Sequence, residues 1–428
     1  MKISSLLILV CSLFSACQSG NRPIVEISYA DSLLKNYSLP EAAKAINGNY
    51  SFWKKRMDSL PDNFVYGPKL SSALSARFHL FGDIEDLLAA DSLLSAASRA
   101  YQQHESGILL NLASLSQLEH RFERARSCLE KARQLSGDNF ATIVTSFDVF
   151  FETGFYKEAE NALNRIYPRD NYAYYFRKSK FEHYAGSLDS SIHYMLLAAE
   201  KANGNKYLQQ AALSNTADLC IHKGDLKKAY QLYQESINLN GTDFHSMLGI
   251  GWIALQHDRN FVLARRIFEF VQAHTASPDA LLKMAYTSDA AGDRTGFKNL
   301  ALAYAKMAGH EKYKNMYNKY LITLYTGVLQ QPETALQLSE QELMNRRTPQ
   351  TYAWYAWALL NNDKKEKAYE VFRQFVSGKP LEGPELYYMG KLMQEMKKGY
   401  NAKRFLEAAQ KNKYDLTPSQ LRDLKKSL

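Results

Sequence analysis

The side chains that could act as nucleophiles, bases or metal ligands are scattered through this sequence of 428 residues. The ten histidines show no HExxH pattern and no paired ligand spacing, and the chain has no glycine-rich phosphate loop and no GxSxG motif. Glu182 and His183 are adjacent, but adjacency along a chain does not bring a base to a nucleophile or a metal. The sequence therefore predicts a protein without catalytic activity, cofactor or metal.

Cys17 stands directly after a short charged start and a brief apolar run, Ile3 to Phe14. That run is too short to span a membrane and is typical of a secretory signal. The tetrad Phe14-Ser15-Ala16-Cys17 resembles a bacterial lipobox, although Phe14 replaces the usual Leu. The resemblance implies that residues 1–16 are removed and that Cys17 is acylated. An ordinary signal peptide, cut nearby and leaving Cys17 as a spare thiol, is the alternative.

Acylation at Cys17 would attach the protein durably to a bilayer, because such a cysteine carries more than one acyl chain. No later apolar run of about 18 residues offers a second membrane attachment. Residues 18–21 contain no acidic side chain, so they lack the acidic stretch that resembles a surface-export signal in lipoproteins of the Bacteroides group. The sequence predicts a bacterial cell-envelope protein on the outer membrane that faces the periplasm.

The stretch from Leu208 to Gly241 reads as two amphipathic helices around the turn Lys223-Gly224-Asp225. Two such helices cannot bury both apolar faces alone, so the unit needs copies of itself on either side. Small residues of the second helix recur every 32 to 38 residues, and Phe297 is the departure from the series. The series is Ala125, Ala159, Ser191, Ala229, Ala264, Phe297, Ala335, Ala368 and Ala402.

This period and its order of small and aromatic residues resemble the tetratricopeptide repeat. The resemblance implies an all-α fold, a right-handed α-solenoid of about nine to ten helix hairpins. We expect a signal at 1–16, a tether and N-terminal capping helices at 17–66, the array at 67–416 and a capping helix at 417–428. In the N-terminal cap, the segment Asn47-Gly48-Asn49 predicts a helix end. Cys128 and Cys220 are expected as buried thiols far from each other.

The first helix of each unit lines the inner groove of a tetratricopeptide superhelix, where such proteins usually bind peptides or partner helices. A mixed aromatic and polar lining suits that role, because aromatic and Arg side chains tend to contribute most of the interface energy. Ordinary repeat surface is the alternative reading for each residue. The candidates are Asn111, Ser114, Asp148, Phe151, Arg177, Lys180, His183, Tyr184, Asn215, Asp218, Tyr286, Asp289, Trp354, Trp357 and Tyr388.

Charge is concentrated at the C-terminal end, because residues 293–428 hold 23 Lys or Arg against 14 Asp or Glu, and the difference of 9 equals the net charge of the chain. A solvated face is the first interpretation, and an anionic surface such as lipid headgroups is the second. No recognition motif for nucleic acid accompanies the charge. The leading hypothesis is a lipid-anchored scaffold that binds a protein or peptide partner. The alternatives are a glycan- or nutrient-uptake lipoprotein and an outer-membrane assembly factor.

Overall fold

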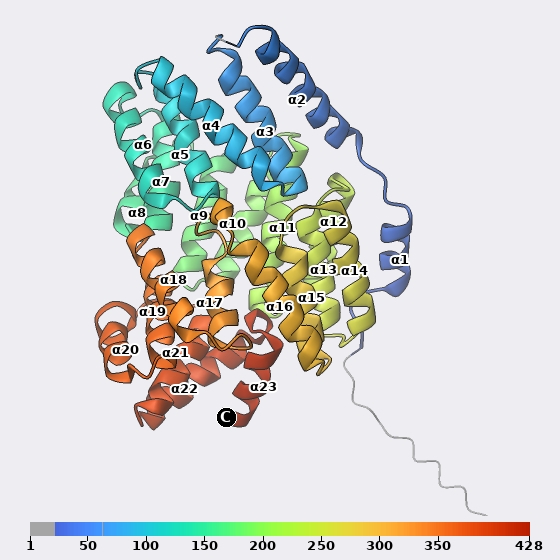
Figure 1. The fold of residues 1–428 in the computed structure, drawn as a ribbon, viewed down its shortest axis with the longest axis vertical. Coiled ribbons are helices and arrows are strands. Elements are labelled where there is room, and N and C mark those ends of the chain that lie inside the picture. The colour runs from blue at the N-terminus through green and yellow to red at the C-terminus, as the bar shows by residue number, and fades with distance from the viewer. Residues whose placement is uncertain (1–21, 62) are drawn as a thin grey trace, which may run out of the picture.

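The computed structural model describes residues 22–61 and 63–428, and in these residues the regular structure is helical. Cys17 and the expected signal lie outside them. Ten helix hairpins follow one another along the described chain (Figure 1). The pairs are α3 (Tyr66–Phe81) and α4 (Ile84–Ala100), α5 (Ser106–Leu118) and α6 (Phe122–Ser136), α7 (Phe140–Thr153) and α8 (Tyr156–Arg165), α9 (Tyr172–Tyr184) and α10 (Leu188–Glu200), α11 (Lys206–Lys223) and α12 (Leu226–Leu239), α13 (Phe244–Gln256) and α14 (Phe261–His274), α15 (Asp279–Ala290) and α16 (Arg294–Ala308), α17 (Asn318–Thr326) and α18 (Pro332–Asn345), α19 (Pro349–Asn361) and α20 (Lys365–Val371), and α21 (Gly383–Glu395) and α22 (Gly399–Lys411).

Three further helices flank or cap these pairs: α1 (Ile27–Lys35), α2 (Glu41–Ser59) and α23 (Pro418–Ser427). Short helical segments extend the connections at η1 (Glu311–Tyr313), η2 (Phe372–Val376) and η3 (Lys413–Asp415). The expected all-α solenoid of stacked helix hairpins is confirmed. No helix of the described residues is both long and apolar enough to cross a membrane.

Glycine followed by aspartate ends one helix and begins the next at several turns. Gly224 has a φ of 82°, in the left-handed region that closes a helix, and Asp225 then accepts a hydrogen bond from the Lys228 amide. A glycine is favoured at such a C-terminal position because it lacks the Cβ that opposes positive φ. The Gly-Asp pairs of the sequence therefore mark the hairpin turns.

The small residues of the second helices are buried where the helices of a hairpin meet. Every member of the series except Phe297 is at most 4% exposed. Phe297 on α16 is only partly buried, and the fully buried small residue of that helix is Ala301, one turn later. The expected irregularity at Phe297 is thus a shift of the close contact by one turn. Cys128 and Cys220 are buried free thiols on α6 and α11.

The array curls so far that its later units contact its early ones (Figure 1). Asn345, at the end of α18, accepts a hydrogen bond from the Phe122 amide at 2.9 Å and donates one to the His120 carbonyl at 2.7 Å. Arg346 lies 3.5 Å from Glu152 of α7. The turn after α18 therefore packs on the turns of the second and third hairpins, more than 190 residues earlier in the chain.

The C-terminal helices lie against the inner face of the array. Trp252 of α13 donates its indole N–H to the Tyr414 carbonyl at 2.8 Å. Asp289 of α15 accepts hydrogen bonds from Ser419 and Arg422 of α23. The inner surface of the solenoid is thus covered in part by η3 and α23.

The N-terminal segment divides between two distant parts of the array. Helix α2 packs on α3, whereas α1 packs on α14 (Figure 1). The predicted helix end at Asn47-Gly48-Asn49 is wrong, because α2 continues through these residues. Glycine costs only about 1 kcal/mol within a helix, and the packing of α2 on α3 offsets such a cost.

Candidate functional site

Two adjoining cavities lie between the inner helices of the array and its C-terminal end. The first, of about 470 Å³, is lined by α11, α13, α15 and α17 and by the segments around α21 and η3. The second, of about 540 Å³, is lined by α7, α9 and α19 and by the same C-terminal segments. Both volumes fall within the range of small-ligand sites, roughly 300–1,000 Å³. Four side chains line both cavities: His222, Lys319, Glu382 and Asp415.

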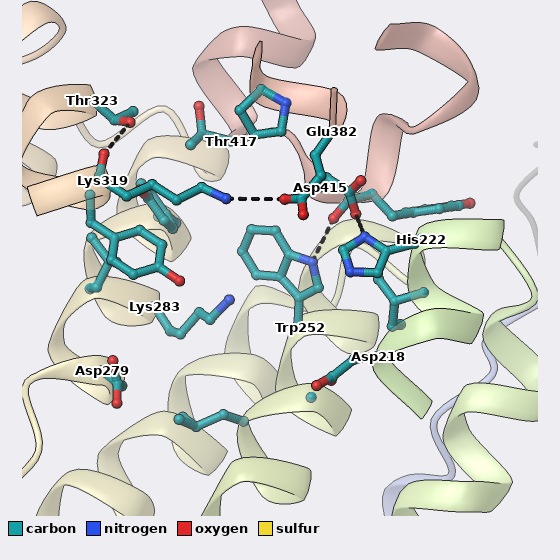
Figure 2. Close-up of a pocket in the computed structure, with 18 of the residues that line it drawn as sticks. Asp218, His222, Trp252, Asp279, Lys283, Lys319, Thr323, Glu382, Asp415 and Thr417 are labelled. Carbon is teal, nitrogen blue, oxygen red and sulfur yellow. Dashed lines mark hydrogen bonds and ion pairs between the residues drawn. The ribbon is translucent and has the colours of Figure 1, made fainter. Parts of the chain in front are cut away.

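These four shared side chains form two ion pairs between the cavities (Figure 2). His222 Nδ1 lies 2.8 Å from an Asp415 carboxylate oxygen, and Lys319 Nζ lies 3.2 Å from Glu382. Burial alone would lower the pKa of His222, but the hydrogen bond and charge of Asp415 outweigh it and raise that pKa to about 9. The charge of Lys319 lowers the pKa of Glu382 to about 2. His222 and Glu382 are therefore charged at neutral pH.

Asp218 organises the floor of the first cavity. One of its carboxylate oxygens accepts a hydrogen bond from the Tyr233 hydroxyl at 2.6 Å, and the other lies 2.8 Å from His245 Nε2. The charge of Asp218 raises the pKa of His245 to about 9. A carboxylate that is bonded on both sides is held in one orientation, so this wall of the cavity is set before anything binds.

Lys283 extends from α15 toward Trp252 in the same cavity (Figure 2). Its ammonium lies 3.9 Å from the centre of the indole ring, a cation–π contact. Burial lowers the pKa of Lys283 to about 8, although the charges of Asp279 and Asp218 counteract part of that effect. Lys283 is thus a partly buried cation that forms no ion pair with a carboxylate in the described residues.

The second cavity has an aromatic wall and a charged wall. The rings of Tyr156 and Tyr184 are stacked with centroids 3.8 Å apart. Lys180 donates to Glu152 at 2.9 Å, and the charges of Lys180 and Arg346 hold the pKa of Glu152 below its usual value despite burial, which opposes them. This arrangement presents flat apolar faces beside fixed charges.

The structure places seven of the fifteen predicted groove residues on these two cavities. They are Asp218 and Tyr286 in the first cavity and Phe151, Lys180, His183, Tyr184 and Trp354 in the second. Their role in binding stays a prediction.

The other eight predicted residues lie elsewhere. Asp148 and Arg177 form an ion pair with each other. Asp289 is held by α23, Tyr388 is buried and bonded to Thr323, and Trp357 lines a separate cavity of about 530 Å³. The exposed residues that line neither main cavity are Asn111, Ser114 and Asn215.

Sequence reasoning missed the four side chains that line both cavities, two of which come from the C-terminal segments and two from first helices. Glu382 is the residue before α21, and Asp415 ends η3, so neither lies on the inner stripe of a first helix. Lys319 and His222 do lie on first helices, α17 and α11. The only signal for Glu382 was an acidic residue at a helix N-terminus, which usually stabilises that terminus. No sequence signal marked Asp415.

The chemistry of the two cavities is that of a binding site with fixed charges. No group of three or more His, Cys, Asp or Glu side chains in the described part of the chain is placed to hold a metal ion. The four side chains shared by the two cavities form two oppositely charged pairs, as do Lys180 and Glu152.

No known protein family and no curated protein matches this sequence. Solved structures with similar arrangements include a tetratricopeptide repeat protein from Parabacteroides merdae, with a TM-score of 0.34, 14% identity, and coverage of 67% of this chain and 98% of that one. The human IFIT1 dimer has a TM-score of 0.46 and 13% identity, covering 89% of this chain and 93% of that one. Yeast Tom70 has a TM-score of 0.35 and 12% identity, covering 94% and 96%. Similarities this weak support no functional conclusion.

Proposed function

We propose that this protein is a lipid-anchored scaffold of the bacterial cell envelope that binds a segment of a protein partner at its two inner cavities. The observation that carries the proposal is the pair of adjoining cavities with preset charges and aromatic walls. A cavity of this kind recognises polar backbone groups by hydrogen bonds and side chains by apolar contact.

A peptide segment suits this site better than a partner helix. A helix with its side chains is about 10–12 Å across, and the C-terminal segments already cover part of the inner face. An extended chain is thinner, and its amides can use the hydroxyl and carboxylate groups of the lining. Tyr320 and Thr323 line the first cavity together with Lys319.

Site-specific photocrosslinking in whole cells tests the proposal. A photoreactive phenylalanine analogue replaces Tyr320, which lines the first cavity and is 39% exposed, or Tyr400 on α22, which is 82% exposed and lines neither main cavity. Both variants start from tyrosine and differ in location. We expect a defined protein adduct from position 320 and none from position 400. Equal labelling at both positions, or glycan adducts alone at position 320, would reject the proposed partner class.

The lipid anchor is tested separately, because it rests on the sequence around Cys17 alone. Mass spectrometry of the N-terminal peptide should find Cys17 as the first residue with acyl chains attached. Cys17→Ser should move the protein out of the membrane fraction. A chain that stays in the membrane fraction after this substitution would contradict the predicted anchor.

A further inference from the structure

The first described residues of the chain are fixed to the turn between α13 and α14. The Ile24 and Val25 amides donate to the two carboxylate oxygens of Asp258, each at 2.9 Å. The Glu26 amide donates to the Tyr230 hydroxyl at 3.3 Å. Val25 is buried, so this segment is part of the folded structure.

Helix α1 continues this attachment along the same helices of the array. Asp31 forms an ion pair with Arg266 of α14 at 2.7 Å. The ring of Tyr37 packs edge-on against Phe270 of α14, with centroids 5.2 Å apart. Contacts at both ends of α1 hold it in place, so Ile24 is a fixed point from which the chain runs back toward Cys17.

The length of chain before this fixed point limits the distance to an anchor. Ile24 follows Cys17 by seven positions, and a fully extended chain spans about 3.3–3.6 Å per residue. An acylated Cys17 would therefore lie within about 25 Å of the Asp258 turn. Since an acylated cysteine sits at the bilayer surface, the α13–α14 turn must stay close to that surface.

The surface beside this turn is basic. A cavity of about 430 Å³ lies between the α13–α14 turn and the C-terminal segments η3 and α23, and its lining includes His257, four Lys or Arg side chains and no Asp or Glu. Arg259, Lys413 and Lys425 are exposed, and in the described residues none of them forms an ion pair. The fourth, Arg422, is held by Asp289.

Exposed apolar side chains adjoin the same turn. Val262, at the start of α14, is 73% exposed, and Ile27, at the start of α1, is 54% exposed. Basic groups beside exposed apolar side chains are the composition that favours a membrane interface, since the former attract anionic headgroups and the latter enter the headgroup region.

We propose that this face, centred on Arg259, Lys413 and Lys425, rests on an anionic bilayer, with a lipid headgroup phosphate in the basic cavity. The orientation rests on the proposed lipid anchor at Cys17, and the charge pattern supports it independently. Part of the C-terminal charge surplus then has a partner: the membrane to which the N-terminus is attached.

Fluorescence quenching in proteoliposomes tests this orientation on the full acylated chain. A single thiol is introduced and labelled at Val262 or, as the control, at Met344 on α18, which is also 73% exposed. The vesicles carry quenchers on their headgroups and contain either neutral phosphatidylcholine alone or phosphatidylcholine with phosphatidylglycerol. We expect strong quenching at 262, further quenching in the anionic vesicles, and little at 344. Equal quenching at the two positions would overturn the orientation.

Charge reversal tests the headgroup site itself. The triple variant Arg259→Glu, Lys413→Glu, Lys425→Glu should lose the extra quenching that anionic lipid produces. A matched triple variant, Lys364→Glu, Lys365→Glu, Lys367→Glu, makes the same charge change on and beside α20 and should keep it. If the first triple variant keeps the extra quenching, the headgroup site is refuted. Equal quenching in neutral and anionic vesicles, with free inorganic phosphate bound by the unaltered cavity but not by the first triple variant, would show a site for a free anion and also refute it.

The membrane-face proposal can be wrong while the proposed scaffold function is right. Mass spectrometry of Cys17 shows whether the anchor exists, and crosslinking at position 320 reports on the inner cavities. An acylated protein that crosslinks its partner but shows no preferred face toward the bilayer would overturn only the membrane-face proposal.

Discussion

Asn345 should hold the eighth hairpin of the curled array against the second. Its side chain makes both of its hydrogen bonds to the backbone of the α5–α6 turn, and Asn345 is only 9% exposed. In Asn345→Ala, each lost bond costs about 1 kcal/mol. The Phe122 amide, the first of α6, then has no intrahelical partner and is buried, which adds about 1–3 kcal/mol. We expect a total loss of roughly 3–5 kcal/mol in the free energy of unfolding.

Urea unfolding followed by circular dichroism measures this loss, and hydrogen exchange locates it. Faster exchange should appear in α5, α6 and α18, on the two sides of the contact. Asn215→Ala is the matched control, because Asn215 is exposed and its amide bonds only to the Ala211 carbonyl of its own helix. That control should change stability by less than about 0.5 kcal/mol. If the two variants lose equal stability, or exchange at α6 is unchanged, the reasoning is refuted.

Three other substitutions test separate contacts. The pKa of His222 is raised to about 9 from about 6.5 when unfolded, so its pairing stabilises the fold fully below pH about 6.5 and is lost as the pH rises to about 9. His222→Gln should flatten thermal stability across that window, and an unchanged pH profile would contradict the pairing. Gly251→Ala should lower the free energy of unfolding by about 1–3 kcal/mol, because the added Cβ would lie 2.4 Å from the buried Phe268 ring. The control Gly399→Ala has open space around the added Cβ and should not destabilise the protein in the same urea denaturation assay. Asp258→Ala should speed hydrogen exchange in residues 24–37 alone, and unchanged exchange there would show that Asp258 does not fix the segment.

The hairpin units could be predicted because their signals are local. Small residues such as Ala229 and Ala264 recur where two helices of one hairpin touch, and Gly224 with Asp225 supplies the dihedral and cap that a turn requires. The helix end predicted at Gly48 was wrong because the packing of α2 on α3 outweighs the weak tendency of a single glycine to end a helix. The sequence thus predicted the contacts between residues that lie within about 40 positions of each other, the length of one hairpin.

The closure of the array could not be predicted from the same pattern. Each unit adds a small rotation to the next, and the sum over ten units decides whether distant turns meet. No local sequence pattern predicts the hydrogen bond between Asn345 and the His120 carbonyl, because the two residues are 225 positions apart. For the same reason, inner-stripe reasoning found Lys180 and Asp218 but not Glu382 or Asp415, which complete the site from the other side.

Closure also changes how such a protein should unfold. An open array contacts only its neighbours, so its end units can detach one at a time. Here the Asn345 contact joins the second hairpin to the eighth, and the Asp289 contacts join α23 to α15. Detaching either end therefore breaks contacts in the middle of the array, which raises the cost of partial unfolding. The wild-type protein should therefore lose all its helices in one urea transition, and two separate transitions would show that an end of the array still detaches on its own.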